Sequence, residues 1–270
     1  MKVFISVDLE GISGIVHFDE TEKEGGGDYE RARRLMTRET NAAVEGAVQG
    51  GATEIVVNDS HGDMRNLLIE DLHPAARLLS GSPKPLSMMQ GLDSTYDAVF
   101  LIGYHSRAGS RGVLSHSYST SVAEYRVNGQ VFGEAGMNAA VAGEFGVPVV
   151  LVAGDSTAVE EARRLLGPIE TVKVKEYVVR TAALHLPPAR AQELLREGAR
   201  KALGRIREIP PFRVQRPVHL EIRFIHSGLA DGAELLPGCL RVDEVTVGYD
   251  APDFLTAYRA GRALMALAAR

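Results

Sequence analysis

The chain has 270 residues, of which 45% are hydrophobic and 24% are charged, and its formal net charge at pH 7 is −5. This composition is typical of a globular protein and excludes a disordered chain. The basic residues are dispersed rather than clustered, so we expect no nucleic-acid partner. The length predicts one α/β core with a smaller appended lobe.

The single cysteine, Cys239, excludes an intramolecular disulfide framework and a multi-cysteine zinc site. We expect it to be a small buried hydrophobic residue. The N-terminal apolar run is too short for a signal peptide and is interrupted by Asp8. No later segment is apolar for long enough to span a bilayer. The sequence therefore predicts a cytoplasmic protein with no membrane partner.

The first predicted strand, residues 3–7, ends in two carboxylates. Its β-branched and aromatic side chains are typical of a central strand covered by helices on both faces. Alternation along an extended chain places Asp8 and Glu10 on the same side, at a strand end where ligands bind in open α/β sheets. Two close carboxylates repel each other unless a cation or a shared proton intervenes. Taken alone, this pattern is more typical of an acidic strand end in a solvated loop.

A loop over residues 12–29 follows. Its glutamates and its Gly25-Gly26-Gly27 run favour an exposed, mobile surface segment over a lid. The preceding Gly11-Ile-Ser-Gly14 fits neither glycine-rich nucleotide motif, which excludes a nucleotide site.

Two further strand ends carry histidines. An amphipathic helix is predicted over residues 31–49, followed by a strand over 54–57 that leads into His61. The next apolar run, residues 98–102, leads into His105. A lone loop histidine is more often structural than a ligand, but these two follow the ends of predicted parallel strands.

His116 lies in a Gly- and Ser-rich stretch, residues 107–120, that is consistent with either a catalytic loop or ordinary coil. Asn128-Gly129 between two apolar runs then predicts a hairpin with a two-residue type I′ turn. Its second strand leads into Glu134, which begins a helix over residues 134–144. A carboxylate at a helix start is usually a cap or a partner of the helix dipole.

The remaining apolar patterns predict alternating strands and helices, with Asp155 as an N-cap. They are a strand over 147–152, a helix over 156–166, a strand over 171–174, a helix over 188–203, a strand over 219–225, a helix over 229–236, a strand over 241–247 and a helix over 254–269. Prolines at 210, 211 and 217 mark a boundary. The expected fold is therefore α/β, with a mostly parallel central sheet and helices on both faces in residues 1–209, and a small C-terminal α/β lobe in residues 210–270.

Five polar side chains follow predicted strand ends or begin a helix. They are Asp8, Glu10, His61, His105 and Glu134. Carboxylates and imidazoles suit zinc or manganese, and this number of ligands is enough for two divalent ions with one bridging carboxylate, an arrangement common in hydrolases. No H-E-x-x-H or G-x-S-x-G motif is present to indicate another hydrolase class.

In its motifs the sequence resembles the zinc-dependent D-aminopeptidase family of the DppA type. Ser6-Val-Asp-Leu-Glu-Gly11 matches the S-x-D-x-E-G signature of that family. Further matches follow in the family's order, at Val57-Asn-Asp-Ser-His61, Gly103-Tyr-His105, Leu114-Ser-His-Ser117 and Gly133-Glu134.

The resemblance implies two Zn²⁺ ions per chain, with Mn²⁺ or Co²⁺ as alternatives. Asp8 would bridge them, Glu10 and His105 would complete one site, and His61 and Glu134 the other. His116 would be the catalytic histidine. The family also implies short peptides that begin with a D-residue, preferably D-alanine, as substrates, and a homo-oligomer with a decamer as the expected size.

Two other functions remain open at this point. One is another dinuclear metal amide hydrolase, which activity on L-peptides or cyclic amides would reveal. The other is a non-catalytic peptide-binding protein that retains the fold.

Overall fold

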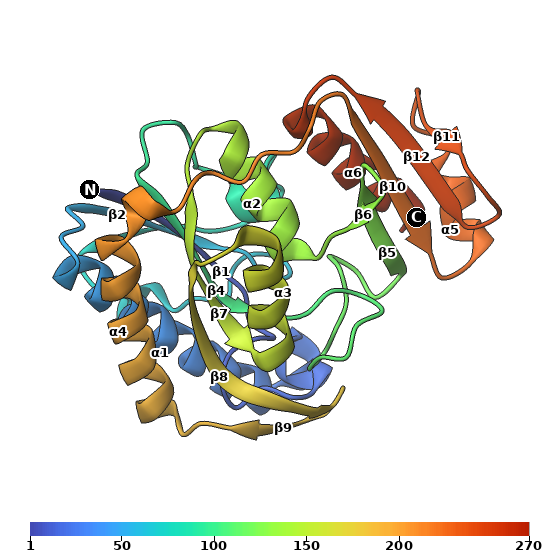
Figure 1. Cartoon of the computed structure of the whole chain (residues 1–270). Coiled ribbons are helices and arrows are strands. Elements are labelled where there is room, and N and C mark those ends of the chain that lie inside the picture. The colour runs from blue at the N-terminus through green and yellow to red at the C-terminus, as the bar shows by residue number, and fades with distance from the viewer. Residues whose placement is uncertain (270) are drawn as a thin grey trace.

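The computed structural model describes residues 1–269, and its core is a seven-stranded sheet in the order β3-β2-β1-β4-β7-β8-β9 (Figure 1). The strands are β1 (Lys2–Val7), β2 (Glu54–Asp59), β3 (Ala76–Leu79), β4 (Ala98–Tyr104), β7 (Val149–Asp155), β8 (Glu170–Val179) and β9 (Ala182–His185). All neighbouring pairs are parallel except β8 and β9 at one edge. The expected mostly parallel sheet is confirmed.

Helices cover both faces of this sheet, because the chain moves outward from its centre in both directions. The connection from β1 to β2 carries α1 (Gly27–Gln49), and the connection from β4 to β7 carries α2 (Glu134–Glu144). Right-handed crossovers in opposite directions place these two helices on opposite faces. α4 (Pro188–Gly204) packs against α1, and α3 (Ser156–Leu166) packs beside α2 (Figure 1). Strands β4 and β7 are buried along their whole length as a result.

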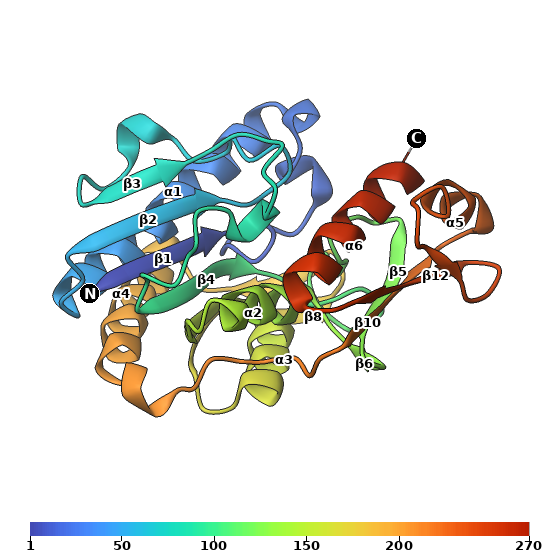
Figure 2. The same ribbon diagram turned by 90° about the horizontal axis from the view of Figure 1, so that it is seen from above.

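A smaller antiparallel sheet has the order β11-β12-β10-β5-β6. Its strands are β5 (Val122–Val127), β6 (Gln130–Val131), β10 (Val218–Phe224), β11 (Leu240–Arg241) and β12 (Thr246–Ala251). Helices α5 (Ser227–Ala233) and α6 (Phe254–Ala268) pack against it, and α6 also contacts α2 (Figure 2).

The small sheet combines the C-terminal segment with the predicted hairpin. Asn128 and Gly129 both have positive φ, 49° and 79°, as a type I′ turn requires, so the predicted turn is confirmed. Strand β5 pairs with β10, which lies far along the chain. The division at residues 209 and 210 stays a prediction, but in space residues 122–131 lie with the C-terminal lobe (Figure 2).

Several element boundaries differ from the sequence prediction. Helix α1 begins four residues earlier, at Gly27, where Asp28 and Glu30 favour the positive end of the helix dipole. The strand expected over 241–247 is split between β11 and β12, because a turn falls within it. Strands β3 and β9 were not predicted, and β8 extends beyond residues 171–174 in both directions. Cys239 is half-buried rather than buried.

No helix within residues 1–269 combines the length and the hydropathy needed to cross a membrane.

Candidate metal centre

The ends of three neighbouring strands lie level at one edge of the central sheet. Val7 in β1 stands opposite Asp59 in β2 and Ile102 in β4. Because the chain leaves β1 toward β2 and later crosses to β4 on its other side, ligand-binding residues are expected between these strand ends. The loops that follow carry Asp8 and Glu10, His61, and His105.

Two glycines let the loops after β1 and β4 approach closely. The Gly11 N–H donates a hydrogen bond to the Gly103 carbonyl over 2.8 Å. A Cβ at Gly11 would collide with the Tyr104 main chain, and a Cβ at Gly103 would collide with that of Asp8. Gly103 also has φ +72°, a conformation that other residues rarely adopt. These contacts bring Asp8 beside His105.

On one side of Asp8, His61 contacts both carboxylates that follow β1. Its Nδ1 lies 3.3 Å from Asp8 Oδ1 and 2.9 Å from Glu10 Oε2. These three buried residues offer one ligand atom each within a space small enough for a single metal ion.

On the other side of Asp8, His105 lies between two carboxylates. Its Nε2 is 3.4 Å from Asp8 Oδ2 and 3.3 Å from Glu134 Oε1. These three residues form a second group able to hold an ion, and Asp8 belongs to both groups. The grouping differs from the expected one, since His61 lies with Glu10 and His105 lies with Glu134.

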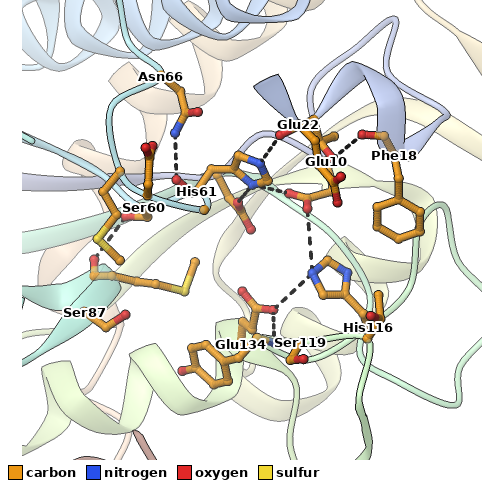
Figure 3. Close-up of a pocket in the computed structure, with 18 of the residues that line it drawn as sticks. Glu10, Phe18, Glu22, Ser60, His61, Asn66, Ser87, His116, Ser119 and Glu134 are labelled. Atoms are coloured by element: carbon orange, nitrogen blue, oxygen red, sulfur yellow. Dashed lines mark hydrogen bonds and ion pairs between the residues drawn. The ribbon is translucent and has the colours of Figure 1, made fainter. Parts of the chain in front are cut away.

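His116 approaches the same cluster from the loop that follows β4. Its Nε2 lies 3.7 Å from Glu10 Oε1 and 4.0 Å from Glu134 Oε1 (Figure 3). Together with Glu10 and His105, it forms a third group of ligand atoms that lie close together. All six residues singled out in the sequence therefore meet at one place.

Each of the three histidines directs one ring nitrogen to a main-chain carbonyl and the other into the cluster. His61 Nε2 lies 2.7 Å from Thr21 O, His105 Nδ1 lies 3.0 Å from Ser106 O, and His116 Nδ1 lies 2.8 Å from Leu114 O. Because a carbonyl only accepts, each of these nitrogens carries the proton. The remaining nitrogen is left facing the carboxylates, as in metal-ligating histidines.

Several buried atoms in the cluster have no hydrogen-bond partner within the described residues. Among them are Asp8 Oδ2, Glu10 Oε2 and His105 Nε2. Buried polar atoms are normally satisfied, so orphaned atoms that converge on one point indicate a missing partner. Carboxylate oxygens and an imidazole nitrogen are suitable zinc ligands, and the residues present therefore fit a metal centre.

Burial and mutual repulsion shape the charges of the cluster. Burial and the neighbouring Glu10 carboxylate raise the pKa of Asp8 to about 7. Burial opposes charge on His105 as well, but Glu134 outweighs it and holds the pKa of His105 well above its usual value. Burial and the nearby His105 lower the pKa of His116. Protons shared between carboxylates and imidazoles occupy positions that a cation takes in a metal site.

The cluster opens into a cavity of about 690 Å³, within the range of small-molecule sites (Figure 3). The loop expected to be a plain surface segment instead lines this cavity, through Phe18, Thr21 and Glu22. Its short helices are η1 (Phe18–Glu20) and η2 (Lys23–Gly25). Apolar residues near its start, Ile12 among them, are fully buried and hold it against the core.

Among the cavity residues that sequence analysis did not single out are an aromatic and a cationic one. Tyr118 lies two residues after His116, and Arg262 comes from α6 of the small lobe. The signal for Arg262 was a charge beside the buried stripe of a helix, between Tyr258 and Met265. Sequence alone could not place Arg262 in the cavity, because that placement depends on where the small lobe packs against the core.

A buried lysine supports the loop after β1. Lys175 in β8 is 1% exposed, and its Nζ donates hydrogen bonds to the main-chain oxygens of Glu10, Ile12 (2.9 Å) and Ile15 (2.7 Å). The sequence does not distinguish this lysine, since Lys173 and Glu176 on the same strand are charged as well.

Comparison with known proteins gives consistent results. A family model described as D-aminopeptidase matches residues 1–263. A D-aminopeptidase of Bacillus subtilis (strain 168) is 43% identical over 273 residues, covering 100% of this chain and 98% of that protein. The solved structure of the Zn-dependent D-aminopeptidase DppA from Bacillus subtilis, called a self-compartmentalizing protease, aligns with a TM-score of 0.97 at 41% identity. That alignment covers 100% of this chain and 98% of the other.

Proposed function

The chain belongs to the D-aminopeptidase family, and we propose that it removes N-terminal D-amino acids, preferably D-alanine, from short peptides with the help of a dinuclear zinc site. The observation that carries this proposal is the convergence of three carboxylates and three imidazoles, with orphaned ligand atoms, at the edge of the central sheet. The Zn-dependence of the similar Bacillus subtilis structure supports the choice of metal.

The proposed ligands are Asp8, Glu10, His61, His105 and Glu134. Asp8 would bridge the two ions, a role supported by its two oxygens, which face different histidines. The N–H of each ligand histidine is held by a main-chain carbonyl, which fixes the ring orientation. Zinc bound there supplies Lewis acidity to the scissile carbonyl, and Mn²⁺ or Co²⁺ is an alternative.

We propose that His116 is the catalytic histidine. Its Nδ1 proton is held by the Leu114 carbonyl, so the Nε2 lone pair is directed toward the cluster. Burial, with a contribution from His105, lowers the pKa of His116 and favours the neutral ring. A neutral imidazole in this position is suited to accept or deliver a proton at the scissile bond, or to attack its carbonyl.

The cavity size and the relative's description guide the remaining proposals. A volume of about 690 Å³ suits short peptides that contain a D-residue. The Bacillus subtilis structure is called self-compartmentalizing, and we propose that this chain also forms a homo-oligomer, with a decamer as the expected size. Exposed apolar residues on the β8–β9 hairpin, Val178, Val179 and Leu184, offer contact area for such an assembly. Light scattering coupled to gel filtration measures the assembly size.

The first experiment is elemental analysis of protein purified without chelator or nickel resin, followed by hydrolysis of matched D-alanyl and L-alanyl peptides. About two zinc ions per chain and cleavage of the D-peptides alone are expected. Two ions with cleavage of L-peptides or cyclic amides would instead indicate another dinuclear amide hydrolase. Binding of peptides without metal and without cleavage would indicate a peptide-binding protein.

A further inference from the structure

Six acidic side chains line the cavity, against one lysine and one arginine. Its carboxylates are Asp8, Glu10, Glu22, Glu24, Asp63 and Glu134. Of the two cations, Lys23 forms an ion pair with Asp63. The other, Arg262, makes no ion pair and no hydrogen bond with any residue in the range 1–269.

The position of Arg262 is set by Tyr118. The guanidinium carbon lies 5.5 Å from the centre of the Tyr118 ring, in a cation–π contact. Tyr118 is itself fixed at its main chain, where its N–H donates to Glu134 Oε1 over 2.7 Å. Its ring also packs edge-on against Tyr258, one turn before Arg262 on α6. One residue, Tyr118, therefore connects the guanidinium to a proposed metal ligand.

This arrangement leaves a half-buried, unpaired guanidinium on the Glu134 side of the cavity. The glutamates of the loop after β1, Glu22 and Glu24, belong to a different segment of the cavity lining. A guanidinium presents donors in a planar fork that matches a carboxylate, and such a pair gains strength where water is partly excluded. Of the lysine and arginine side chains that line the cavity, Lys23 is paired with Asp63, whereas Arg262 has no carboxylate partner within residues 1–269 and is free to pair with an anionic ligand group.

We propose that Arg262 binds the free C-terminal carboxylate of the substrate and so makes the enzyme selective for short, unblocked peptides. This inference rests on the proposed peptidase function. Once the scissile carbonyl lies at the metal cluster, the chain beyond it extends by roughly 3.5 Å per residue. Because Tyr118 alone separates Arg262 from Glu134, a carboxylate bound at Arg262 belongs to a peptide with few residues after the scissile bond. Longer peptides place their carboxylate past Arg262.

The test compares D-alanyl-D-alanine with its C-terminal amide, using the zinc-loaded full chain. In the wild type, kcat/KM is expected to be about 10- to 100-fold higher for the free acid, mainly through KM, because a charge-assisted hydrogen bond is lost in the amide. Arg262→Gln is expected to bring this ratio close to one, and Arg262→Lys to restore part of it. The ratio does not change when part of a preparation is misfolded, since both substrates then lose the same fraction of activity.

Arg259→Gln is the matched control, since Arg259 is exposed on the same helix and is expected to keep the wild-type ratio. Equal turnover of acid and amide by the wild type, or an unchanged ratio in Arg262→Gln, would overturn the inference while leaving the proposed function intact. Failure of the zinc-loaded wild type to cleave either D-peptide would overturn the proposed function, and this inference with it.

Discussion

The imidazole rings of His105 and His116 are stacked, with centroids 4.0 Å apart and planes inclined by 7°. His105 faces Asp8 and Glu134, whereas His116 faces Glu10 and Glu134 from the cavity side. Two histidines of the same cluster thus occupy different layers. The buried ring belongs to the proposed metal centre, and the ring above it is accessible to substrate in the cavity.

His116→Ala is expected to retain zinc and to lose activity. The five proposed ligands remain in this variant, while the loss of a positioned proton-transfer group lowers kcat by about 10²- to 10⁴-fold. Metal content and steady-state kinetics on a D-alanyl peptide measure the two effects separately. His226→Ala is the control, because His226 is exposed in the small lobe. Unchanged turnover in His116→Ala would remove this residue from the catalytic machinery.

Asp8→Ala and Glu134→Ala are expected to lose different amounts of metal. Asp8 belongs to the group with Glu10 and His61 and also to the group with His105 and Glu134. Glu134 belongs to the second group alone. Asp8→Ala is therefore expected to bind almost no zinc, and Glu134→Ala about one ion per chain, against about two in the wild type. Elemental analysis after dialysis against zinc decides the matter, with the exposed Asp250→Ala as control. Full metal content or full activity in Asp8→Ala contradicts the bridging role.

Much of the candidate metal centre was predictable because its residues follow local patterns. Asp8, His61 and His105 each come just after a buried strand, and parallel strands bring their carboxyl ends to one edge. The type I′ turn at Asn128 was also predictable from two residues alone. Local sequence determined these features, and the fold needed only to align the strands.

Features that depend on contacts between distant segments were not predictable in the same way. Strand β5 pairs with β10, about ninety residues later, and nothing near Tyr125 indicates that partner. The placement of Arg262 in the cavity follows from the docking of α6 against α2. The same holds for the loop after β1, whose composition indicated exposure but whose buried Ile12 and Ile15 anchor it against the core.

Lys175→Met is expected to weaken both the fold and metal binding. The variant keeps an apolar stem but leaves three buried main-chain oxygens without the Nζ donor, one of them on Glu10. Each unsatisfied acceptor costs roughly 1–3 kcal/mol, so the free energy of unfolding is expected to fall by at least about 2 kcal/mol. Because the Glu10 main chain is then free to shift, zinc affinity should fall as well.

Denaturant unfolding and zinc titration calorimetry measure these two losses. Lys173→Met is the matched control, since Lys173 lies on the same strand but is exposed and pairs with Glu176. A Lys175→Met variant with the zinc affinity of the wild type would show that the loop after β1 holds its shape without the lysine.

The titration of Glu39 is expected to lower the free energy of unfolding as the pH rises, whereas carboxylates with a lowered pKa raise it. The side chain lies on α1, is 2% exposed and accepts one hydrogen bond, from Ser13 N over 2.9 Å, while its Oε2 has no partner among residues 1–269. Burial raises the pKa of Glu39 from 4.5 to about 7. The folded state therefore binds a proton that the unfolded state has released between these two values. This stabilisation is complete below about pH 4.5 and is lost as the pH rises through about 7.

Glu39→Gln removes this titration while keeping an oxygen for Ser13. Relative to the wild type, the variant is expected to gain stability between pH 5 and pH 8, by up to about 3 kcal/mol. The measurement is the difference in free energy of unfolding between the two proteins at each pH, which cancels the titration of the metal centre common to both. Glu30→Gln serves as control, because Glu30 is exposed on the same helix. A pH-independent difference for Glu39→Gln would mean that Glu39 is ionised in the folded protein throughout this range, with its charge balanced by groups such as Lys175.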